Sequence, residues 1–150
     1  MKVYFIFDIK EEFIKLYTGN EYVLYSILKQ IYYLDKNDLS FGYNLFNQLT
    51  NKINKQELDK KLFIQFHQDI PYSKKGQTHY INNLYKDEIS RLIIKRSYIK
   101  LESEQNFSTF FSILKNFSNN FFVCNFSDPD YFFLNKDELS PKITLKTYTI

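Results

Sequence analysis

The sequence predicts an α+β fold, with a mixed, mainly antiparallel sheet of about five strands packed with about four to five helices. The chain opens on a strand pattern, continues through several helical segments, and returns to strand patterns only in its second half. That second half contains a hairpin pattern, which favours antiparallel pairing over a doubly wound parallel sheet. The 150 residues are enough for a real core, and we expect a single globular domain over 1–150.

Residues 2–8, "KVYFIFD", predict the first strand. Both of its alternating sets are apolar, so we expect a central strand that is covered on both faces. Asp8-Ile9-Lys10-Glu11 fits a capping box, and Gly19 fits a left-handed helix stop. The first helix is therefore expected over about 9–18.

Three further helices are expected before the middle of the chain. They cover 21–34, which Asn20 can cap, then 39–50 and 54–69. Apolar residues at helical spacing predict their inner sides, which are Leu24, Ile27, Leu28 and Ile31 in the first, Leu39, Tyr43, Phe46 and Leu49 or Leu45 in the second, and Leu58, Leu62 and Phe66 in the third.

The second half of the chain alternates between strand and helix patterns. Residues 70–78 are expected to form a basic loop, since Pro71 and Gly76 break regular structure, and 79–88 are ambiguous between strand and helix. A hairpin is expected over 90–103 with its turn near Arg96-Ser97. The remaining predictions are a helix over 106–118 with Phe107, Phe110, Phe111 and Leu114 inward, strands over 119–127 and 131–135, and a tail at 141–150 that forms an edge strand or stays mobile.

Composition and motifs argue against several classes of function. Cys124 is the only cysteine, and it lies in an apolar run that predicts a buried thiol. With two histidines and no cysteine pair, we expect no metal site, and without a glycine-rich phosphate loop or a nucleophile elbow we expect no cofactor and no enzyme. No apolar run approaches the length of a membrane span, so we expect no membrane contact and a cytoplasmic protein.

The first helix carries more apolar surface than one buried stripe needs. At about 100° per residue, Ile9, Phe13 and Leu16 cluster within about 60° and suffice to hold it on a sheet. Tyr17 and Ile14 widen this stripe, with Lys10 between them. Two interpretations stay open, because these side chains can pack on the following helices or form a ridge that binds another protein. The 13 tyrosines and 16 phenylalanines also indicate that some aromatic rings lie at an interface.

A different class of function is a module that binds single-stranded nucleic acid through the 72–100 surface. Cations and aromatic rings alternate in this stretch, namely Lys74, Lys75, Lys95, Arg96 and Lys100 with Tyr72, Tyr80 and Tyr98. The net charge of +3 is modest, however, and no RNP-type or helix-turn-helix signature occurs. We therefore expect no direct contact with nucleic acid and keep this function as the alternative.

Two stretches of the chain resemble one known family. "YFIFDIKEEFIKLYTGNEYVLYSIL" resembles the opening of the sporulation inhibitor of replication (SirA) family of endospore-forming Bacillus relatives, which has an aromatic strand, I-K-E-E-F, a Tyr four residues later, and a Gly before a second helix. "FFSILKNFSNNFFVCNFSDPDYFFLN" is similar to the family's F-F-x-x-L-K helix, aromatic strand and Y-x-aromatic-L-N ending. The resemblance is good over about 60 residues and extends more loosely across the chain.

The resemblance implies a small cytoplasmic protein without enzymatic activity, which stops new rounds of replication by binding the N-terminal domain of the initiator DnaA. It implies that the binding surface uses the first helix, through Phe13 and Tyr17, together with a later helix near 45–51. We expect Lys10, Ile14, Leu45, Gln48 and Asn51 to belong to this surface of a monomer. Relatives have a Tyr where this chain has Gln48, so the contact role of that position is open. Lys136 also departs from the family's Pro, and a host that does not sporulate would have a different trigger.

Overall fold

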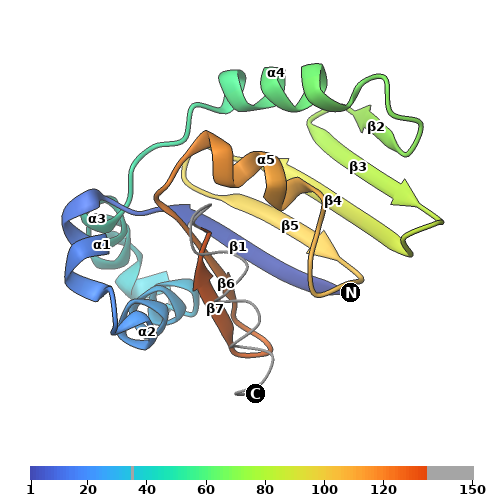
Figure 1. Ribbon diagram of the computed structural model, residues 1–150. Coiled ribbons are helices and arrows are strands. Elements are labelled where there is room, and N and C mark those ends of the chain that lie inside the picture. The colour runs from blue at the N-terminus through green and yellow to red at the C-terminus, as the bar shows by residue number, and fades with distance from the viewer. Residues whose placement is uncertain (35, 135–150) are drawn as a thin grey trace.

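The computed structural model describes residues 1–34 and 36–134, and Figure 1 shows how their elements are arranged. Within these residues there are five α-helices and seven strands, so the α+β class and the helix number are confirmed, whereas the expected strand number was too low. Every strand pair in the sheet is antiparallel, so the expectation of a mixed sheet was wrong. The elements in chain order are β1 (Lys2–Asp8), α1 (Glu11–Tyr17), α2 (Glu21–Tyr32), a 3-10 turn (Lys36–Asp38), α3 (Leu39–Leu49), α4 (Lys55–Phe66), β2 (Tyr72–Lys75), β3 (Thr78–Asn83), β4 (Glu88–Ile94), β5 (Ile99–Ser103), α5 (Phe110–Phe117), β6 (Phe121–Asn125) and β7 (Asp130–Phe133).

The first strand lies inside the sheet. The strand order is β2-β3-β4-β5-β1-β6-β7, so β1 joins the β2–β5 meander to the β6–β7 hairpin. Tyr4 and Ile6 point to one face of the sheet, and Phe5 and Phe7 point to the other. This confirms the prediction that β1 is a central strand with apolar contacts on both sides.

The additional strands come from a segment that was expected to be a loop. Lys75 pairs with Thr78 across a two-residue turn, in which Gly76 has a φ of +60°. Residues 70–78 therefore enter a hairpin instead of a loop, and the ambiguous segment that follows continues as β3. β2 is short and carries exposed lysines at the edge of the sheet, where they discourage pairing with another chain.

The hairpin between β4 and β5 agrees with its prediction. Its turn lies at Arg96 and Ser97, and the Lys95 amide donates to the Tyr98 carbonyl oxygen at 2.9 Å. β4 begins at Glu88, two residues before the expected start, because the pairing with β3 extends to Asn83. The strands over 119–127 and 131–135 are also present, as β6 and β7.

Two helices cover one face of the sheet. The expected residues Leu58, Leu62 and Phe66 of α4 are buried, and the Asn54 side chain caps this helix by accepting from the Glu57 amide at 3.2 Å. Phe110, Phe111 and Leu114 of α5 are buried as predicted, whereas Phe107 precedes the helix and is exposed. We call this side the first core; its largest fully buried members are Tyr4, Phe110, Phe121, Ile6, Leu58, Leu62, Leu92 and Ile94.

The other three helices lie against the opposite face, at the β1–β6–β7 end of the sheet (Figure 1). We call this side the second core; its buried members are Phe7, Ile9, Leu24, Tyr25, Leu28, Phe122, Cys124 and Phe126. Leu24 and Leu28 of α2 are buried as predicted, but Ile27 and Ile31 are only half-buried. In α3 the expected inner residues Leu39 and Tyr43 are exposed and Phe46 is half-buried. Leu49 is buried as expected, and Gly42 is buried as well.

The start of α1 differs from the predicted capping box. Asp8 is the last residue of β1, and the Ile9 amide donates to the Asn120 carbonyl oxygen at 2.9 Å. Extended backbone therefore continues through Lys10, and α1 begins at Glu11 without a side-chain cap. Asn20 likewise precedes α2 without a side-chain hydrogen bond to it. Gly19 has a φ of +89°, which confirms the left-handed stop.

Two further expectations concern the C-terminal tail and the absence of a membrane span. The tail at 141–150, expected to be an edge strand or mobile, lies outside the described residues, as does Lys136. Among the helices of residues 1–34 and 36–134, none combines the length and the apolarity needed to cross a bilayer.

Candidate functional site

The backbone brings the start of α1 next to the end of α3. Ile9 forms an isolated β-bridge with Thr50, and the Lys10 amide donates to the Leu49 carbonyl oxygen at 2.9 Å. The Asn51 amide donates to the Asp8 carbonyl oxygen at 2.7 Å. Residues 8–10 therefore run alongside residues 49–51. The two segments that the sequence singled out lie side by side at this point, and we call their seven residues the α1–α3 surface: Lys10, Phe13, Ile14, Tyr17, Leu45, Gln48 and Asn51.

The side chain of Asn51 takes part in this connection. Its Nδ2 donates to Asp8 Oδ1 at 3.0 Å, and the Ser118 hydroxyl lies 3.4 Å from Asp8 Oδ2. Burial raises the pKa of the Asp8 carboxyl, and the hydrogen bonds from Asn51 and Ser118 offset only part of this effect. The Asn51 amide is thus engaged inside the protein. It positions α1 against α3 and is less available to a partner than the sequence suggested.

The inner side of α1 is formed by Phe13, Ile14 and Tyr17. All three are half-buried and pack against the second core, and the Phe13 and Tyr17 rings stack with their centroids 6.5 Å apart at 17°. No residue of α1 is fully buried. Tyr17 and Ile14 therefore pack inside the chain only in part. Each of the two side chains, like Phe13, also keeps an accessible portion.

Leu16 lies on the outside of α1, with 61% of its surface exposed. The sequence placed it with Ile9 on the buried stripe, but Ile9 belongs to extended backbone and does not share a helical face with it. Once the helix starts at Glu11, the inward arc is set by Phe13, Ile14 and Tyr17, and Leu16 falls outside this arc. The continued β-pairing of Ile9 was the signal that sequence patterning missed.

On α3, Leu45 is half-buried and Gln48 is exposed. Phe41 has 71% of its surface exposed and stands at i−4 from Leu45 and i−7 from Gln48, on the same helical stripe. Phe41 was not among the residues expected at this surface, although its spacing in the sequence places it with Leu45 and Gln48. An exposed aromatic ring therefore shares the stripe of Leu45 and Gln48.

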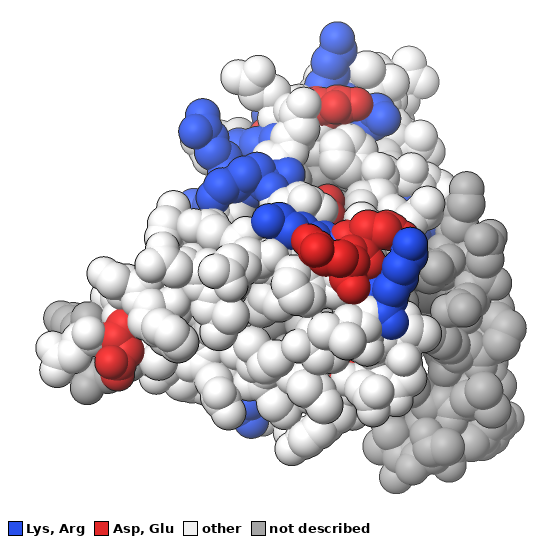
Figure 2. All heavy atoms as spheres, turned by 90° about the vertical axis from the view of Figure 1, so that its left-hand side faces the viewer, with Lys and Arg blue, Asp and Glu red and all other residues white. Residues whose placement is uncertain are grey.

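Figure 2 looks onto the side of the molecule on which α1 and α3 lie. Most of its charged side chains gather in the upper half and at the centre, and the area to the left of and below them is largely uncharged. Glu11, Glu12 and Lys15 belong to α1 and are exposed, so the helix presents charge beside its apolar residues. This combination of aromatic contact area with a charged margin is typical of protein–protein interfaces.

The residues of the alternative nucleic-acid surface are not brought together. Tyr72 is buried, and its hydroxyl lies 2.8 Å from His79 Nδ1. Tyr98 packs against Phe5 in the second core, with ring centroids 5.8 Å apart. Tyr80 remains accessible beside Lys75, whose Nζ lies 5.9 Å from the ring centroid. The expected row of stacking rings is therefore reduced to one tyrosine.

A buried Asp–His–Tyr line connects α4 to β2 and β3. His79 Nε2 lies 2.7 Å from Asp59 Oδ1, and burial lowers the pKa of the His79 imidazole despite the neighbouring carboxylate. A neutral imidazole satisfies both contacts, since Nε2 donates to Asp59 and Nδ1 accepts from the Tyr72 hydroxyl. Burial acts to raise the pKa of Asp59, but the hydrogen bonds from His79 and Lys55 lower it overall. This line joins a helix to the sheet.

A second polar cluster surrounds Glu88, which is completely buried. Its carboxylate accepts from the hydroxyls of Ser90, Ser108 and Thr109 and from the Thr109 amide at 2.9 Å. Burial acts to raise the pKa of Glu88, and these hydrogen bonds outweigh it, so that the pKa lies below its usual value. Because Thr109 immediately precedes α5, Glu88 serves that helix as a cap supplied by a distant strand. Within residues 1–34 and 36–134, no group of three or more His, Cys, Asp or Glu side chains is placed to hold a metal ion.

Comparison with known protein families agrees with the arrangement of these elements. The family model described as sporulation inhibitor of replication protein SirA matches residues 2–137. The chain belongs to the SirA family. The match runs from the first strand to just beyond the last described residue, so the family's model includes both segments of the α1–α3 surface. No curated protein sequence matches the chain.

Membership of the SirA family confirms the resemblance and makes the chain a member of a family of regulatory inhibitors of replication that is associated with sporulation. The family description points to a protein partner in replication control. It directs attention to surfaces that can bind another protein, and the α1–α3 surface has that character because half-buried aromatic rings lie beside exposed apolar and charged side chains.

Proposed function

We propose that this chain is a non-enzymatic inhibitor of replication initiation, which acts in the cytoplasm by binding the N-terminal domain of the bacterial initiator DnaA through the α1–α3 surface. The observation that carries the proposal is the family match over residues 2–137. The inhibitor covers a surface that initiator assembly or an activating partner needs. Inhibition of this kind requires only binding, and no reaction is catalysed.

The centre of the proposed contact is the stacked pair Phe13 and Tyr17. Large aromatic rings supply much contact area while losing little conformational entropy, and hot spots of interfaces are enriched in them. Both rings are already held in place by the second core, so their ordering costs little on binding. Leu16 adds exposed apolar area one residue before Tyr17.

The second part of the proposed contact is the outer stripe of α3. Leu45 and the exposed Phe41 provide apolar area there, and Gln48 contributes a polar side chain at the position where the family resemblance implies a Tyr. We propose that Phe41 supplies the aromatic contact on this helix. It lies about 10 Å along the helix from Gln48, given a rise of 1.5 Å per residue. The partner would then contact α3 nearer to its first turn.

Calorimetric titration of the purified N-terminal domain of the cognate initiator tests the proposal. We expect Tyr17→Ala to weaken binding by about 2 kcal/mol or more, which corresponds to a factor of about 30. Leu16→Ala is a second variant, because Leu16 is exposed and its truncation leaves the cores intact. Tyr85→Ala is the matched control, since Tyr85 is a fully exposed tyrosine in the β3–β4 turn.

Thermal melts of the same variants separate binding from folding. Tyr17 packs on the second core, so a moderate loss of stability is expected for Tyr17→Ala, and none for Leu16→Ala. Wild-type affinity in both variants would overturn the assignment of the site. A loss of affinity that only follows the loss of folded protein would assign Tyr17 to the core. Titration with single-stranded oligonucleotides at two salt concentrations tests the alternative, which predicts binding that weakens steeply with salt.

A further inference from the structure

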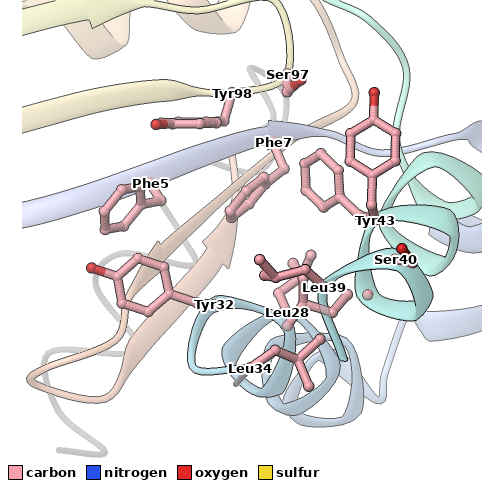
Figure 3. Close-up of a pocket in the computed structure, with 13 residues that line it drawn as sticks. Phe5, Phe7, Leu28, Tyr32, Leu34, Leu39, Ser40, Tyr43, Ser97 and Tyr98 are labelled. Atoms are coloured by element: carbon pink, nitrogen blue, oxygen red, sulfur yellow. The ribbon is translucent and has the colours of Figure 1, made fainter. Parts of the chain in front are cut away.

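An apolar pocket of about 610 Å³ lies between α2, α3 and the second face of the sheet (Figure 3). Pockets that take small molecules typically measure about 300–1,000 Å³ and have mainly apolar and aromatic walls. The sheet contributes Phe5, Phe7 and Tyr98 as one wall. The helices contribute the facing walls, through Leu28, Ile31, Tyr32 and Leu34 on the α2 side and Leu39, Ser40, Gly42, Tyr43 and Phe46 on α3.

The contact between α2 and α3 explains why the pocket stays open. α3 approaches the end of α2 so closely at Gly42 that a Cβ there would lie 2.1 Å from Leu34 Cδ1. At the sheet, Phe46 contacts Phe7, with ring centroids 5.6 Å apart, and Tyr32 contacts Phe5 at 5.0 Å. These contacts hold the helices at the two ends of the pocket. Between them the walls face one another across a space.

Two exposed residues of the pocket are ones that sequence patterning placed in the core. Leu39 and Tyr43 have 54% and 59% of their surface exposed, and they share a helical stripe with Phe46. A helix that presents an apolar stripe toward a sheet normally buries it. Here an occupant with an apolar body would remove these side chains from water, which is favourable in proportion to the area covered.

The polar and charged groups around the pocket indicate which chemical group would accompany the apolar body of such an occupant. None of the residues that line it is charged, and the walls carry the hydroxyls of Ser40, Tyr43, Ser97 and Tyr98. Lys100 pairs with Phe5 across the sheet and so lies on the same face, and Lys52 Nζ lies 5.9 Å from the Tyr43 ring centroid.

The acidic residues near this pocket do not cancel its cations. Glu102 is engaged by Arg91, with an N–O distance of 2.9 Å. Asp38 precedes Leu39 in the chain and, like Lys52 and Lys100, lies outside the lining of the pocket. Two lysines thus stand against this one carboxylate around the pocket. The immediate surroundings of the pocket therefore favour an anionic group beside an apolar body.

We propose that the pocket between α2, α3 and the sheet binds one molecule of a long-chain monocarboxylic acid. The alkyl chain lies between Leu39, Tyr43 and the sheet wall of Phe5 and Tyr98. The carboxylate lies at the rim, where Lys100 and the hydroxyls neutralise and solvate it.

This site is separate from the α1–α3 surface. At about 100° per residue, Leu39, Tyr43 and Phe46 lie within about 60° of one another on α3, whereas Leu45 and Gln48 lie more than about 90° away. One helix thus presents two different stripes, and ligand binding does not depend on the proposed partner.

Titration with sodium dodecanoate below its micellar concentration tests the proposal, with 1-dodecanol as the uncharged probe of equal chain length. Calorimetry is expected to show one molecule of dodecanoate per chain and binding at least tenfold weaker for dodecanol. Leu39→Asp is expected to weaken dodecanoate binding at least tenfold. Phe41→Asp is the matched control, because Phe41 is also exposed near the start of α3 but does not line the pocket, and it is expected to bind like the wild type.

Two further variants test the head group and the pocket volume. Lys100→Gln is expected to weaken dodecanoate binding about threefold or more and to leave dodecanol unchanged. Ser40→Trp places a large ring in the pocket and is expected to abolish binding, whereas Ser112→Trp on the exposed side of α5 is its control. Circular dichroism identifies any variant that does not fold. If Leu39→Asp or Ser40→Trp is lost in this way, the other of these two variants and its control test the proposal.

Several results would overturn the proposal. These are the absence of saturable binding, equal affinity for dodecanol and dodecanoate, or wild-type binding by both Leu39→Asp and Ser40→Trp. Vesicles of phosphatidylglycerol separate a free acid from a membrane surface. Binding to such vesicles without binding of free dodecanoate would assign the apolar walls to a lipid surface and overturn the proposed ligand.

Discussion

The two faces of the sheet are covered in different ways. Under α4 and α5, side chains such as Leu58, Leu62 and Leu114 are completely buried, and the polar groups among them have hydrogen-bond partners. Under α1, α2 and α3 the cover is thinner, since α1 has no fully buried residue and Leu39 of α3 is exposed. The first face is a closed core, and the second is a core with accessible aromatic walls.

This difference indicates a division of roles within one sheet. Stability comes from apolar area removed from water, and the first core removes it most completely. Interaction requires apolar area that is held in place but still accessible, and the second face provides that in α1, in α3 and in the pocket between α2 and α3. Segments that bind other molecules are often drawn from the less stable part of a fold.

The largest effect should come from truncation in the first core. Leu62→Ala removes a completely buried side chain of α4, and we expect the free energy of unfolding to fall by about 2–5 kcal/mol. Leu16→Ala on α1 is the counterpart from the other face, and we expect a change within about 0.5 kcal/mol. Urea denaturation measures both. Similar losses in the two variants would show that the faces do not differ in this way.

The next effect concerns the buried carboxylate of the first core. Glu88→Gln keeps the shape of the side chain but removes its charge, and we expect a loss of about 1.5–3 kcal/mol at pH 7, as is typical of hydrogen bonds to charged groups. The pKa of Glu88 is lower in the folded protein than its usual 4.5. Its stabilisation is therefore present above about pH 4.5 and is lost as the pH falls through the folded pKa.

Unfolding measured between pH 3 and pH 7 checks the direction of this pH dependence. The difference between wild type and Glu88→Gln should be largest at pH 7 and shrink as the carboxylate is protonated. The exposed Glu104, replaced by Gln, is the control and should follow the wild type at every pH. A difference that is constant across this range would assign the effect to packing instead of charge.

The smallest effect tests the one buried tyrosine hydroxyl of α2. Tyr25→Phe removes a hydroxyl that donates to the Asn125 carbonyl oxygen at 2.8 Å, and we expect a loss of about 1 kcal/mol near pH 7. Burial raises the pKa of Tyr25 to about 12 from its usual 10.0. The contribution of its proton is present below pH 10 and declines as the pH rises toward 12. Tyr22→Phe, on the exposed side of the same helix, should show neither effect in alkaline unfolding measurements.

Local patterns predicted those elements that are stabilised by their own residues. The alternation in β1, the turn at Arg96 and Ser97, and the spacing of Leu58 and Leu62 in α4 all correspond to what the structure shows. Gly19 also ends α1 as expected, because its left-handed backbone conformation is accessible to glycine without strain.

The features that could not be predicted depend on contacts between distant residues. α1 starts at Glu11 because Ile9 pairs with Thr50, about forty residues away, and Leu16 is exposed as a consequence. Glu88 caps a helix that starts about twenty residues later in the chain. For the candidate site, the sequence selected Phe13 and Tyr17, but it could not show that Asn51 is engaged by Asp8 or that the Phe41 ring is exposed.

The position of β1 has a consequence for synthesis of the protein. Lys2 pairs with Ser103, and Phe5 pairs with Cys124 on the other side, so β1 is synthesised about a hundred residues before either of its neighbours. At about 5–20 residues per second, this strand waits roughly 5–20 s for its first partner. The β2–β5 meander can form from its local hairpins during that time, whereas the two parts of the sheet join only when β1 enters between them. During translation, the nascent chain therefore exposes this largely apolar strand until β5 has been made.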